Sequence, residues 1–418
     1  MNLPKEFIQD MQELLGQESQ DFFDTYNYPP YKGLRINTQK IKNINDLPFS
    51  LEPIPWCNTG YYYNDEEQPG KHILHEIGLY YIQEPSAMAV VEEMNINQGD
   101  YVLDLCAAPG GKSTQIGAKL KGTGLLVSNE IIKSRSLILS SNIERMGIKN
   151  AVVLNEEPKN IAKHFKCFFN KILVDAPCSG EGMFRKNPEA ISEWSEENVE
   201  MCAARQLDIL EEAAKCLIPG GRLVFSTCTF STKENEGTIG TFIKNHPEFT
   251  LLKTERLYPH KIKGEGHFIA VLEKEGTGIL PIINNKEIKQ NPDFIKFVKD
   301  TLNVDIKYNL VFGDNLYLSP ITKLDGLKVV RPGLHLGELK KNRFEPSHSL
   351  ALALTKEDFK NIEDLTDKDA EDFIKGLTIA TNKVGWGAAC VNCYPIGWFK
   401  GDGRIGKNHY PKGLRKDL

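Results

Sequence analysis

The chain has no apolar run close to the roughly 20 residues that would cross a membrane, so no membrane contact is expected. Its first residues lack the basic and then apolar pattern of a secretory signal. Internal repeats and low-complexity tracts are absent as well. These absences argue against membrane-spanning, secreted and repeat proteins, and they predict a cytoplasmic location.

The nine cysteines lack the spacings of a disulfide framework, and we interpret them as reduced thiols. One C-x-x-C pair, Cys390 and Cys393, has no second pair of ligands, which a structural zinc site needs. The sequence therefore predicts no metal.

The chain is short of basic charge overall but not at its C-terminal end. With 418 residues it is too long for one ordinary core, and its net charge is −5. Residues 381–418 nevertheless carry seven basic and two acidic side chains, together with five aromatic ones. Basic groups bind phosphates and aromatic faces stack on bases. Composition alone leaves two interpretations open, RNA contact or a solvated basic end with buried aromatics.

From Asp100 onwards, strand-like and helix-like patterns alternate, which predicts a doubly wound parallel sheet. We expect strands at 101–105, 125–128, 151–154, 171–174, 223–225 and 267–272, and helices at 113–120, 133–146 and 197–217. Before this region we expect a helix at 4–15, a strand at 33–38 and a loop at 56–70. After a polar stretch at 273–278 we expect a helix at 292–302, short strands at 309–312, 316–318 and 327–330, a helix from about 349, and a glycine-rich end with short strands.

The segment after the first of these strands has the features of a nucleotide-binding loop. Asp104 ends the strand, and Pro109-Gly110-Gly111 precedes the helix. Glycines allow close approach of a ligand, and the helix N-terminus offers free N–H groups. Glu130 ends the next strand, where a carboxylate can bind both ribose hydroxyls.

Two other nucleotide-binding motifs do not match this loop. Gly111-Lys112-Ser113 resembles the end of a phosphate-binding loop, but that motif requires glycine where Cys106 stands. The dinucleotide pattern G-x-G-x-x-G is absent as well. The strand aspartate, the loop and the ribose acid together favour S-adenosylmethionine as the cofactor over a mononucleotide.

Two cysteines follow strand-like runs at 171–174 and 222–225. They are Cys178, in Asp175-Ala176-Pro177-Cys178, and Cys228, in Ser226-Thr227-Cys228. Parallel sheets bind ligands at the carboxyl ends of their strands, so two thiols and a carboxylate there indicate covalent chemistry. A free cysteine is commonly a small buried hydrophobe. That interpretation suits four further cysteines better: Cys106, Cys167, Cys202 and Cys216.

The segments 104–113, 175–182 and 226–229 resemble the signature segments of the Sun/Nop/RsmF family of RNA (cytosine-5) methyltransferases. The likeness covers about 80–275, including 81–88, which resembles the family's segment leading into the catalytic domain. Residues 264–268 and 407–415 resemble the bacterial RsmF branch. That branch methylates small-subunit ribosomal RNA and carries a C-terminal PUA-like RNA-binding module.

The resemblance implies an α/β protein with a Rossmann-like S-adenosylmethionine-dependent methyltransferase core, a small N-terminal α+β domain, and C-terminal α/β and PUA-like modules. We place the domains at 1–92, 93–275, 285–343 and 344–418. The expected partner is ribosomal RNA or the small ribosomal subunit, bound by a monomer.

The resemblance also implies roles for individual residues. Glu130 would hold the ribose with Arg135 nearby, and Asp175 would touch both substrate and cofactor. Cys228 would be the nucleophile that adds to cytosine C6, and Cys178 would help to release the product. The cofactor would be cradled by the loop residues Cys106, Ala107, Ala108, Pro109, Gly110, Gly111 and Lys112.

One segment departs from the family pattern. The family usually has an acidic residue, often in Asp-Gly, after the third strand to meet the adenine. Here that stretch is Asn155-Glu156-Glu157-Pro158. The spacing favours Glu157, and Glu156 stays an alternative.

Two rival functions stay open. A DNA cytosine-5 methyltransferase would use the Pro-Cys motif, which contains Cys178, but the Thr-Cys motif and the basic C-terminal end favour RNA. A non-catalytic RNA-binding assembly factor is disfavoured because Cys228, Cys178, Asp175 and Glu130 are all present.

Overall fold

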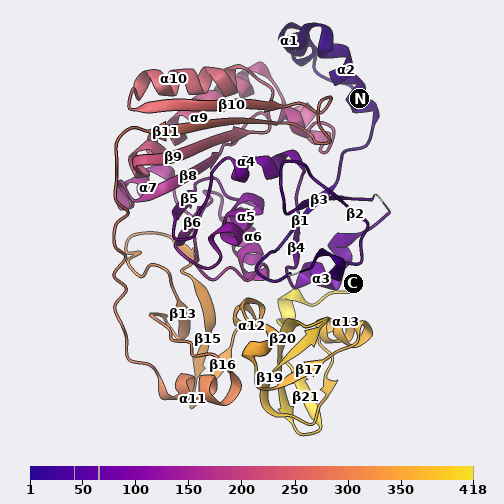
Figure 1. Cartoon of the computed structure of the whole chain (residues 1–418), viewed down its shortest axis with the longest axis vertical. Helices are drawn as coiled ribbons and strands as arrows, with labels where there is room; N and C mark the ends of the chain where they lie inside the picture. The colour runs from indigo at the N-terminus through magenta and orange to yellow at the C-terminus, as the bar shows by residue number, and fades with distance from the viewer. Residues whose placement is uncertain (42, 65, 418) are drawn as a thin grey trace.

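The computed structural model describes residues 1–41, 43–64 and 66–417. Positions 42 and 65, in the predicted N-terminal domain, and position 418, in the predicted PUA-like domain, lie outside the described residues. Within the described part of the chain the strands form four sheets, one much larger than the others. Figure 1 shows the large sheet in the upper half of the molecule and the C-terminal part of the chain below it.

The large sheet has the strand order β10-β11-β9-β8-β5-β6-β7-β14. Strands β5 to β9 are parallel to one another, whereas β11, β10 and β14 pair antiparallel at the two ends of the sheet. This topology confirms the predicted α/β, Rossmann-like class. The strands are β5 (Tyr101–Asp104), β6 (Leu125–Asn129), β7 (Ala151–Leu154), β8 (Phe169–Asp175), β9 (Leu217–Thr227), β10 (Phe249–Leu257), β11 (His267–Lys274) and β14 (Val329–Arg331).

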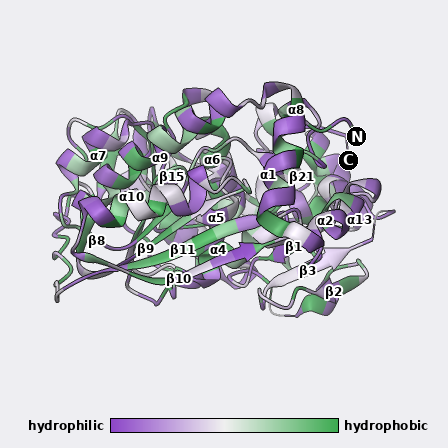
Figure 2. Ribbon diagram, turned by 90° about the horizontal axis from the view of Figure 1, so that it is seen from above, coloured by the Kyte–Doolittle hydropathy of each residue, from purple (hydrophilic) through white to green (hydrophobic). Residues whose placement is uncertain are grey.

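Helices cover both faces of this sheet, so the strands between them are buried on both sides and read as continuous apolar runs. Figure 2 shows β9 and β11 as hydrophobic strands in the interior. One face is covered by α7 (Pro158–His164), α9 (Glu196–Cys216) and α10 (Thr238–Asn245). The other is covered by α4 (Ala89–Glu92), α5 (Gly111–Leu120) and α6 (Lys133–Arg145).

The sheet differs from the sequence-based expectation in three respects. The pattern does not predict β10, α7 or α10, and β11 is antiparallel, so the sheet is not entirely parallel. Strand β9 also starts earlier, at Leu217. In its pairing with β8, Leu217 lies opposite Phe169, and the next pair is Arg222 opposite Lys171. Pro219 and the two following glycines therefore form a bulge within β9.

The N-terminal region carries a four-stranded sheet in the order β2-β3-β1-β4. Strand β3 lies inside the predicted loop at 56–70, and that prediction is wrong: alternate residues of β3 are buried, so it pairs as an ordinary strand. The elements are α1 (Lys5–Leu15), α2 (Ser19–Asp24), β1 (Gly33–Ile36), β2 (Leu51–Pro53), β3 (Gly60–Tyr63), α3 (Ile73–Glu76) and β4 (Tyr80–Ile82).

Helices α1 and α2 bring aromatic side chains onto the catalytic region. Phe7 and Phe22 pack with Phe184, Trp194 and Phe230 in one buried cluster. The ring centroids of Phe7 and Phe184 are 5.1 Å apart, and those of Phe22 and Phe230 are also 5.1 Å apart. The start of the chain is therefore anchored beside the segments that follow β8 and β9.

The C-terminal region holds two smaller sheets, in the orders β12-β13-β15-β16 and β17-β19-β20-β21-β18. Strand β14, which lies between β13 and β15 in sequence, leaves this region and joins the edge of the large sheet. The elements are α11 (Pro292–Thr301), β12 (Leu310–Phe312), β13 (Asn315–Leu318), β15 (Leu334–Lys340), β16 (Arg343–Pro346), α12 (His348–Ala353), β17 (Ile362–Asp364), α13 (Asp367–Lys375), β18 (Ile379–Ala380), β19 (Val384–Val391), β20 (Tyr394–Asp402) and β21 (Ile405–Asn408).

The C-terminal sheet packs against the N-terminal domain. Apolar side chains of both, including Leu74, Phe373 and Tyr410, belong to one buried cluster. At the rim, Lys416 lies 2.7 Å from Glu76. Figure 1 accordingly shows the C-terminus beside α3. None of the helices in the described ranges is long and apolar enough to span a bilayer.

Candidate active site

A cavity of about 780 Å³ opens where β5, β6, β8 and β9 end. Parallel sheets bind ligands at this edge, and the volume suits a small-molecule cofactor. Among its lining residues are eight that the sequence predicted: Cys106, Ala108, Glu130, Arg135, Glu157, Asp175, Cys178 and Cys228.

The remaining predicted loop residues, Ala107, Pro109, Gly110, Gly111 and Lys112, do not line the cavity. Gly110 has a φ of 114°, which favours glycine and turns the chain into α5. Helix α6 holds the loop from outside: Arg135 donates to the Ala108 carbonyl at 2.9 Å, and the next carbonyl, of Pro109, accepts from the Asn142 side chain at 2.9 Å. The loop is thus a fixed wall of the cavity.

Glu130 follows β6 and is only 3% exposed. One of its carboxylate oxygens accepts the Ile132 N–H at 2.9 Å, and the other lies 3.4 Å from Arg135 Nη1. These contacts hold a buried carboxylate at the cavity wall. Because ribose hydroxyls donate hydrogen bonds and a carboxylate accepts them, the group fits the predicted role.

Glu156 and Glu157, which follow β7, have different surroundings. The Glu156 carboxylate is buried and accepts from the Lys328 N–H at 2.7 Å and from the Asn160 amide at 2.8 Å. Glu157 is exposed and lines the cavity. The geometry therefore favours Glu157 over Glu156 as the residue that meets a bound adenine.

Beside the cavity, an ion pair and a pair of thiols meet. Lys112 Nζ, from α5, donates to Asp175 Oδ2 at 2.8 Å, and Ser226 Oγ donates to Asp175 Oδ1 at 2.7 Å. The sulfur atoms of Cys178 and Cys228 are 3.3 Å apart. The structure thus brings the three predicted catalytic residues and Lys112 to one edge of the sheet.

The electrostatics of this cluster follow from burial and pairing. Burial alone would raise the pKa of Asp175, but the Lys112 ammonium and the Ser226 hydrogen bond outweigh it and lower that pKa. Burial likewise opposes the charge on Lys112, yet Asp175 raises the Lys112 pKa. The hydrogen bond with Cys228, reinforced by burial, raises the pKa of the Cys178 thiol well above its usual value. At neutral pH the ion pair is charged and Cys178 keeps its proton.

Sequence reasoning missed the buried carboxylates that support the cysteine loops. Glu234 accepts the Ser179 N–H at 3.0 Å and the Gln206 amide at 2.8 Å. Glu181 accepts from the Trp194 indole at 3.0 Å, so Trp194 packs behind the loop. Glu181 stands inside the segment 175–182 and could have been singled out there. Glu234 follows no motif and carries no local signal.

Other missed residues form the outer wall of the cavity. Some lie at the end of β6 or just after it, and the others lie on α9. The residues of α9 reach the cavity only because that helix packs against the sheet. These missed residues are Asn129, Ile131, Ile132, Arg205, Asp208 and Ile209.

Four family models match successive parts of the chain. They describe the N-terminal domain of 16S rRNA methyltransferase RsmF (residues 3–85), 16S rRNA methyltransferase RsmB/F (91–273), the RsmF rRNA methyltransferase first C-terminal domain (293–354) and the methyltransferase RsmF PUA domain (360–416). Together they span nearly the whole sequence.

Two relatives from different bacteria align over the whole length and have the same name. The ribosomal RNA small subunit methyltransferase F of Vibrio vulnificus is 31% identical, with 100% of this chain and 97% of the relative covered. The protein of that name from Escherichia coli is 30% identical, with 99% and 97% covered.

Two solved structures share the architecture. The crystal structure of PH0851 is 30% identical with a TM-score of 0.62, covering 65% of this chain and 66% of that one. A methyltransferase homolog from Pyrococcus horikoshii is 26% identical with a TM-score of 0.58, covering 65% and 95%.

The Rossmann-like sheet, the cavity at its strand ends and these relatives define an S-adenosylmethionine-dependent methyltransferase with a C-terminal PUA domain. Because relatives at least 30% identical align over the full length, the chain belongs to the RsmF family of ribosomal RNA small subunit methyltransferases. The family resemblance, the fold class and the cofactor predicted from the sequence are confirmed.

Proposed function

We propose that this protein methylates C5 of cytosine in small-subunit ribosomal RNA through a covalent bond between Cys228 and C6 of the base. The observation that carries the proposal is the juxtaposition of two thiols, 3.3 Å apart, with the Lys112–Asp175 ion pair at the cofactor cavity. We further propose that it acts as a cytoplasmic monomer on ribosomal RNA or the small subunit.

Cytosine C5 is a weak nucleophile, and this explains the need for a thiolate. Addition of the Cys228 sulfur to C6 turns the ring into an enamine whose C5 can attack an electrophile. S-adenosylmethionine, when bound, supplies an electrophilic methyl group. A base then accepts the C5 proton, the electron pair of that C–H bond restores the C5–C6 double bond, and the Cys228 thiolate leaves.

The ion pair suits the polar edge of the base. As a carboxylate, Asp175 accepts hydrogen bonds, and the ammonium of Lys112 donates them, so together they match the donor and acceptor groups of cytosine. Lys112 also lies within electrostatic reach of Cys228. A nearby cation stabilises a nucleophilic thiolate.

The raised pKa of Cys178 supports different roles for the two thiols. A thiol that keeps its proton at neutral pH is a poor nucleophile but can exchange a proton with its neighbour. Cys178 therefore assists product release, and Cys228 attacks. The cofactor is held by the cavity-lining residues of the loop, Cys106 and Ala108, together with Glu130, Arg135, Glu157 and Asp175.

The test is a trapping experiment with two variants and ribosomal RNA. Cys228→Ala should abolish methylation and form no covalent adduct. Cys178→Ala should transfer the methyl group and then stay bound to its RNA, seen as a slowly migrating band that resists denaturation. Mass spectrometry should locate 5-methylcytosine in RNA treated with the unmodified enzyme. Flipping the target base costs a few kcal/mol, so unpaired RNA should trap more than duplex.

Two outcomes would overturn the proposal. An adduct that survives in Cys228→Ala and disappears in Cys178→Ala would indicate the DNA-type arrangement, with Cys178 as nucleophile. Ribosomal RNA left unmethylated by the unmodified enzyme, both naked and in the small subunit, would favour a non-catalytic assembly factor.

A further inference from the structure

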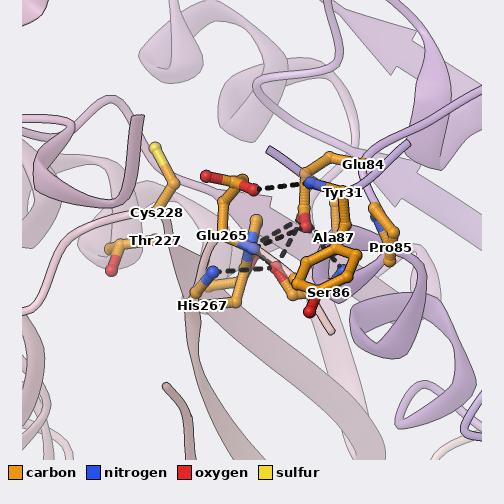
Figure 3. Close-up of polar contacts among 12 residues, drawn as sticks. Tyr31, Glu84, Pro85, Ser86, Ala87, Thr227, Cys228, Glu265 and His267 are labelled. Carbon is orange, nitrogen blue, oxygen red and sulfur yellow. Dashed lines mark hydrogen bonds and ion pairs between the residues drawn. The ribbon is translucent and has the colours of Figure 1, made fainter. Parts of the chain in front are cut away.

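A buried polar chain runs from the end of the N-terminal domain to the catalytic sheet. Ser86 Oγ donates to Glu84 Oε2 at 2.5 Å and lies 3.0 Å from His267 Nδ1. The Ser86 hydroxyl also accepts the Gly266 N–H at 3.2 Å. Ser86 is fully buried, and the side chains of His267 and Glu84 are 7% and 8% exposed. Figure 3 shows this chain with Cys228 close by.

The hydrogen bonds determine the tautomer of His267. A serine hydroxyl has one proton, and Glu84 accepts it. The bond between Ser86 and His267 therefore has Nδ1–H as its donor. A neutral imidazole protonated on Nδ1 carries a lone pair on Nε2, on the side of the ring away from Ser86.

The register of the sheet places this ring on the catalytic face. On β11, Ile269 pairs with Ser226, whose hydroxyl binds Asp175. Successive strand residues alternate between faces, so His267, two residues before Ile269, points to the same face as Ser226. The imidazole interacts electrostatically with both Lys112 and Asp175.

The ring stays uncharged in this setting. Burial, together with the nearby Lys112 ammonium, lowers the pKa of His267 to about 4. A neutral imidazole can accept a hydrogen bond from an ammonium, whereas an imidazolium would repel the ammonium. Lys112 has three N–H donors, of which Asp175 takes one at 2.8 Å.

We propose that His267 is a positioning residue: its Nε2 lone pair orients the Lys112 ammonium, and Ser86 and Glu84 hold the ring in the tautomer that leaves this lone pair free. The inference rests on the proposed function, because it gives Lys112 and Asp175 a task at the base. It also makes the N-terminal segment 84–86 part of the catalytic machinery, although no residue of that segment touches the thiols in the described contacts.

Two substitutions separate the two ends of the ring. In His267→Asn the amide reaches the Nδ1 position and can still donate to Ser86, but nothing occupies the Nε2 position. In His267→Gln the amide oxygen reaches the Nε2 position and can accept from Lys112. We expect kcat to fall on the order of 10-fold or more in His267→Asn, with the KM for RNA within about 2-fold. His267→Gln should recover most of that loss.

Thermal unfolding and S-adenosylmethionine affinity should be nearly the same in both variants. The matched control is His335→Asn, since His335 is also hydrogen-bonded but belongs to β15, in the first C-terminal sheet. It should leave kcat unchanged. Adduct formation by Cys178→Ala should slow when His267→Asn is added.

Unchanged kcat in His267→Asn would overturn the inference. If kcat falls equally in His267→Asn and His267→Gln, and the melting temperature falls with it, the hydrogen bonds of His267 only hold β11 against segment 84–86. Neither result touches the proposed function, which is tested separately by 5-methylcytosine formation in the unmodified enzyme and by adduct formation in the Cys228 and Cys178 variants.

Discussion

A single buried carboxyl at the end of β5 links stability to pH. Asp104 is fully buried, one of its oxygens accepts from Ser113 at 2.6 Å, and the other has no hydrogen-bond partner among the described residues. Burial, together with the nearby Asp175 charge, raises the pKa of Asp104 to about 7. In the unfolded chain the same group would ionise near pH 4.

The folded state therefore binds more protons than the unfolded state between about pH 4 and pH 7. Its free energy of unfolding should fall as the pH rises through this window, by at most about 1.4 kcal/mol per pH unit from this group. Asp104→Asn removes the ionisation and should flatten the curve in that window. Denaturant unfolding at several pH values measures both proteins. Parallel curves for the two would show that Asp104 does not titrate in this range.

At the scale of elements, strand β14 reaches back from the C-terminal region to the cofactor cavity. It pairs with β7 at the edge of the large sheet, and the Lys328 N–H binds the Glu156 carboxylate. The neighbouring residue, Glu157, lines the cavity. This C-terminal strand therefore fixes the loop that we expect to meet the adenine. The predicted domain limits at 275 and 343 remain predictions, and β14 pairs across the first of them.

The two glutamates should respond differently to truncation. Glu156→Ala removes two part-buried hydrogen bonds to a carboxylate, from the Lys328 N–H and the Asn160 amide, and should destabilise the protein by about 1–3 kcal/mol. Its effect on cofactor affinity arises through the displaced loop. Glu157→Ala should weaken S-adenosylmethionine binding with little change in stability, because the side chain is exposed.

Calorimetry and thermal unfolding of both variants separate these effects. Glu130→Ala, which removes the predicted ribose ligand, is the positive control for lost cofactor affinity. The assignment of Glu157 to the adenine would be reversed if Glu156→Ala stayed stable but bound S-adenosylmethionine more weakly, while Glu157→Ala kept full affinity.

On the scale of the whole molecule, the PUA domain presents a row of one aromatic and two basic side chains across three strands. Trp386 on β19 lies opposite Lys400 on β20, which lies opposite Lys407 on β21. Lys400 Nζ sits 5.2 Å from the Trp386 ring centroid, and both lysines are exposed. Like charges directly opposite each other destabilise a sheet. Their presence beside an aromatic ring favours a surface that contacts RNA phosphates.

Replacing Lys400 and Lys407 together by glutamate should weaken RNA binding and make the logarithmic salt dependence shallower by about 1 to 2, because up to two phosphate contacts are lost. Affinity for S-adenosylmethionine should stay the same. Lys296→Glu, which reverses an exposed charge on α11 outside the PUA sheet, is the control. RNA affinity that keeps its full salt dependence in the double variant would place the RNA elsewhere on the molecule.

Point variants are preferable here to deleting the chain from about 345. Phe373 and Tyr410 share a buried cluster with Leu74 of the N-terminal domain. A deletion would expose that apolar surface, so its effect on RNA binding would not report on the basic row alone.

Much of the fold and part of the site follow from the sequence by itself. Alternation of apolar strands with helices is a local signal, and it predicts the Rossmann-like core because each element carries its own periodicity. Cys178, Cys228 and Asp175 could be singled out because they stand directly after such strands, and Glu130 because its distance from the glycine loop is set by one helix and one strand.

Tertiary structure decided what depends on contacts between distant parts of the chain. Glu156 is engaged by the N–H of Lys328, which lies just before β14 and 172 residues later in the sequence, and Glu157 is left to line the cavity. The hydrogen bond between Ser86 and His267 joins residues that are 181 positions apart in the sequence. The antiparallel pairing of β11 and β10 is also a matter of packing. No local pattern encodes such contacts, because each arises only when burial of the shared core brings the two segments together.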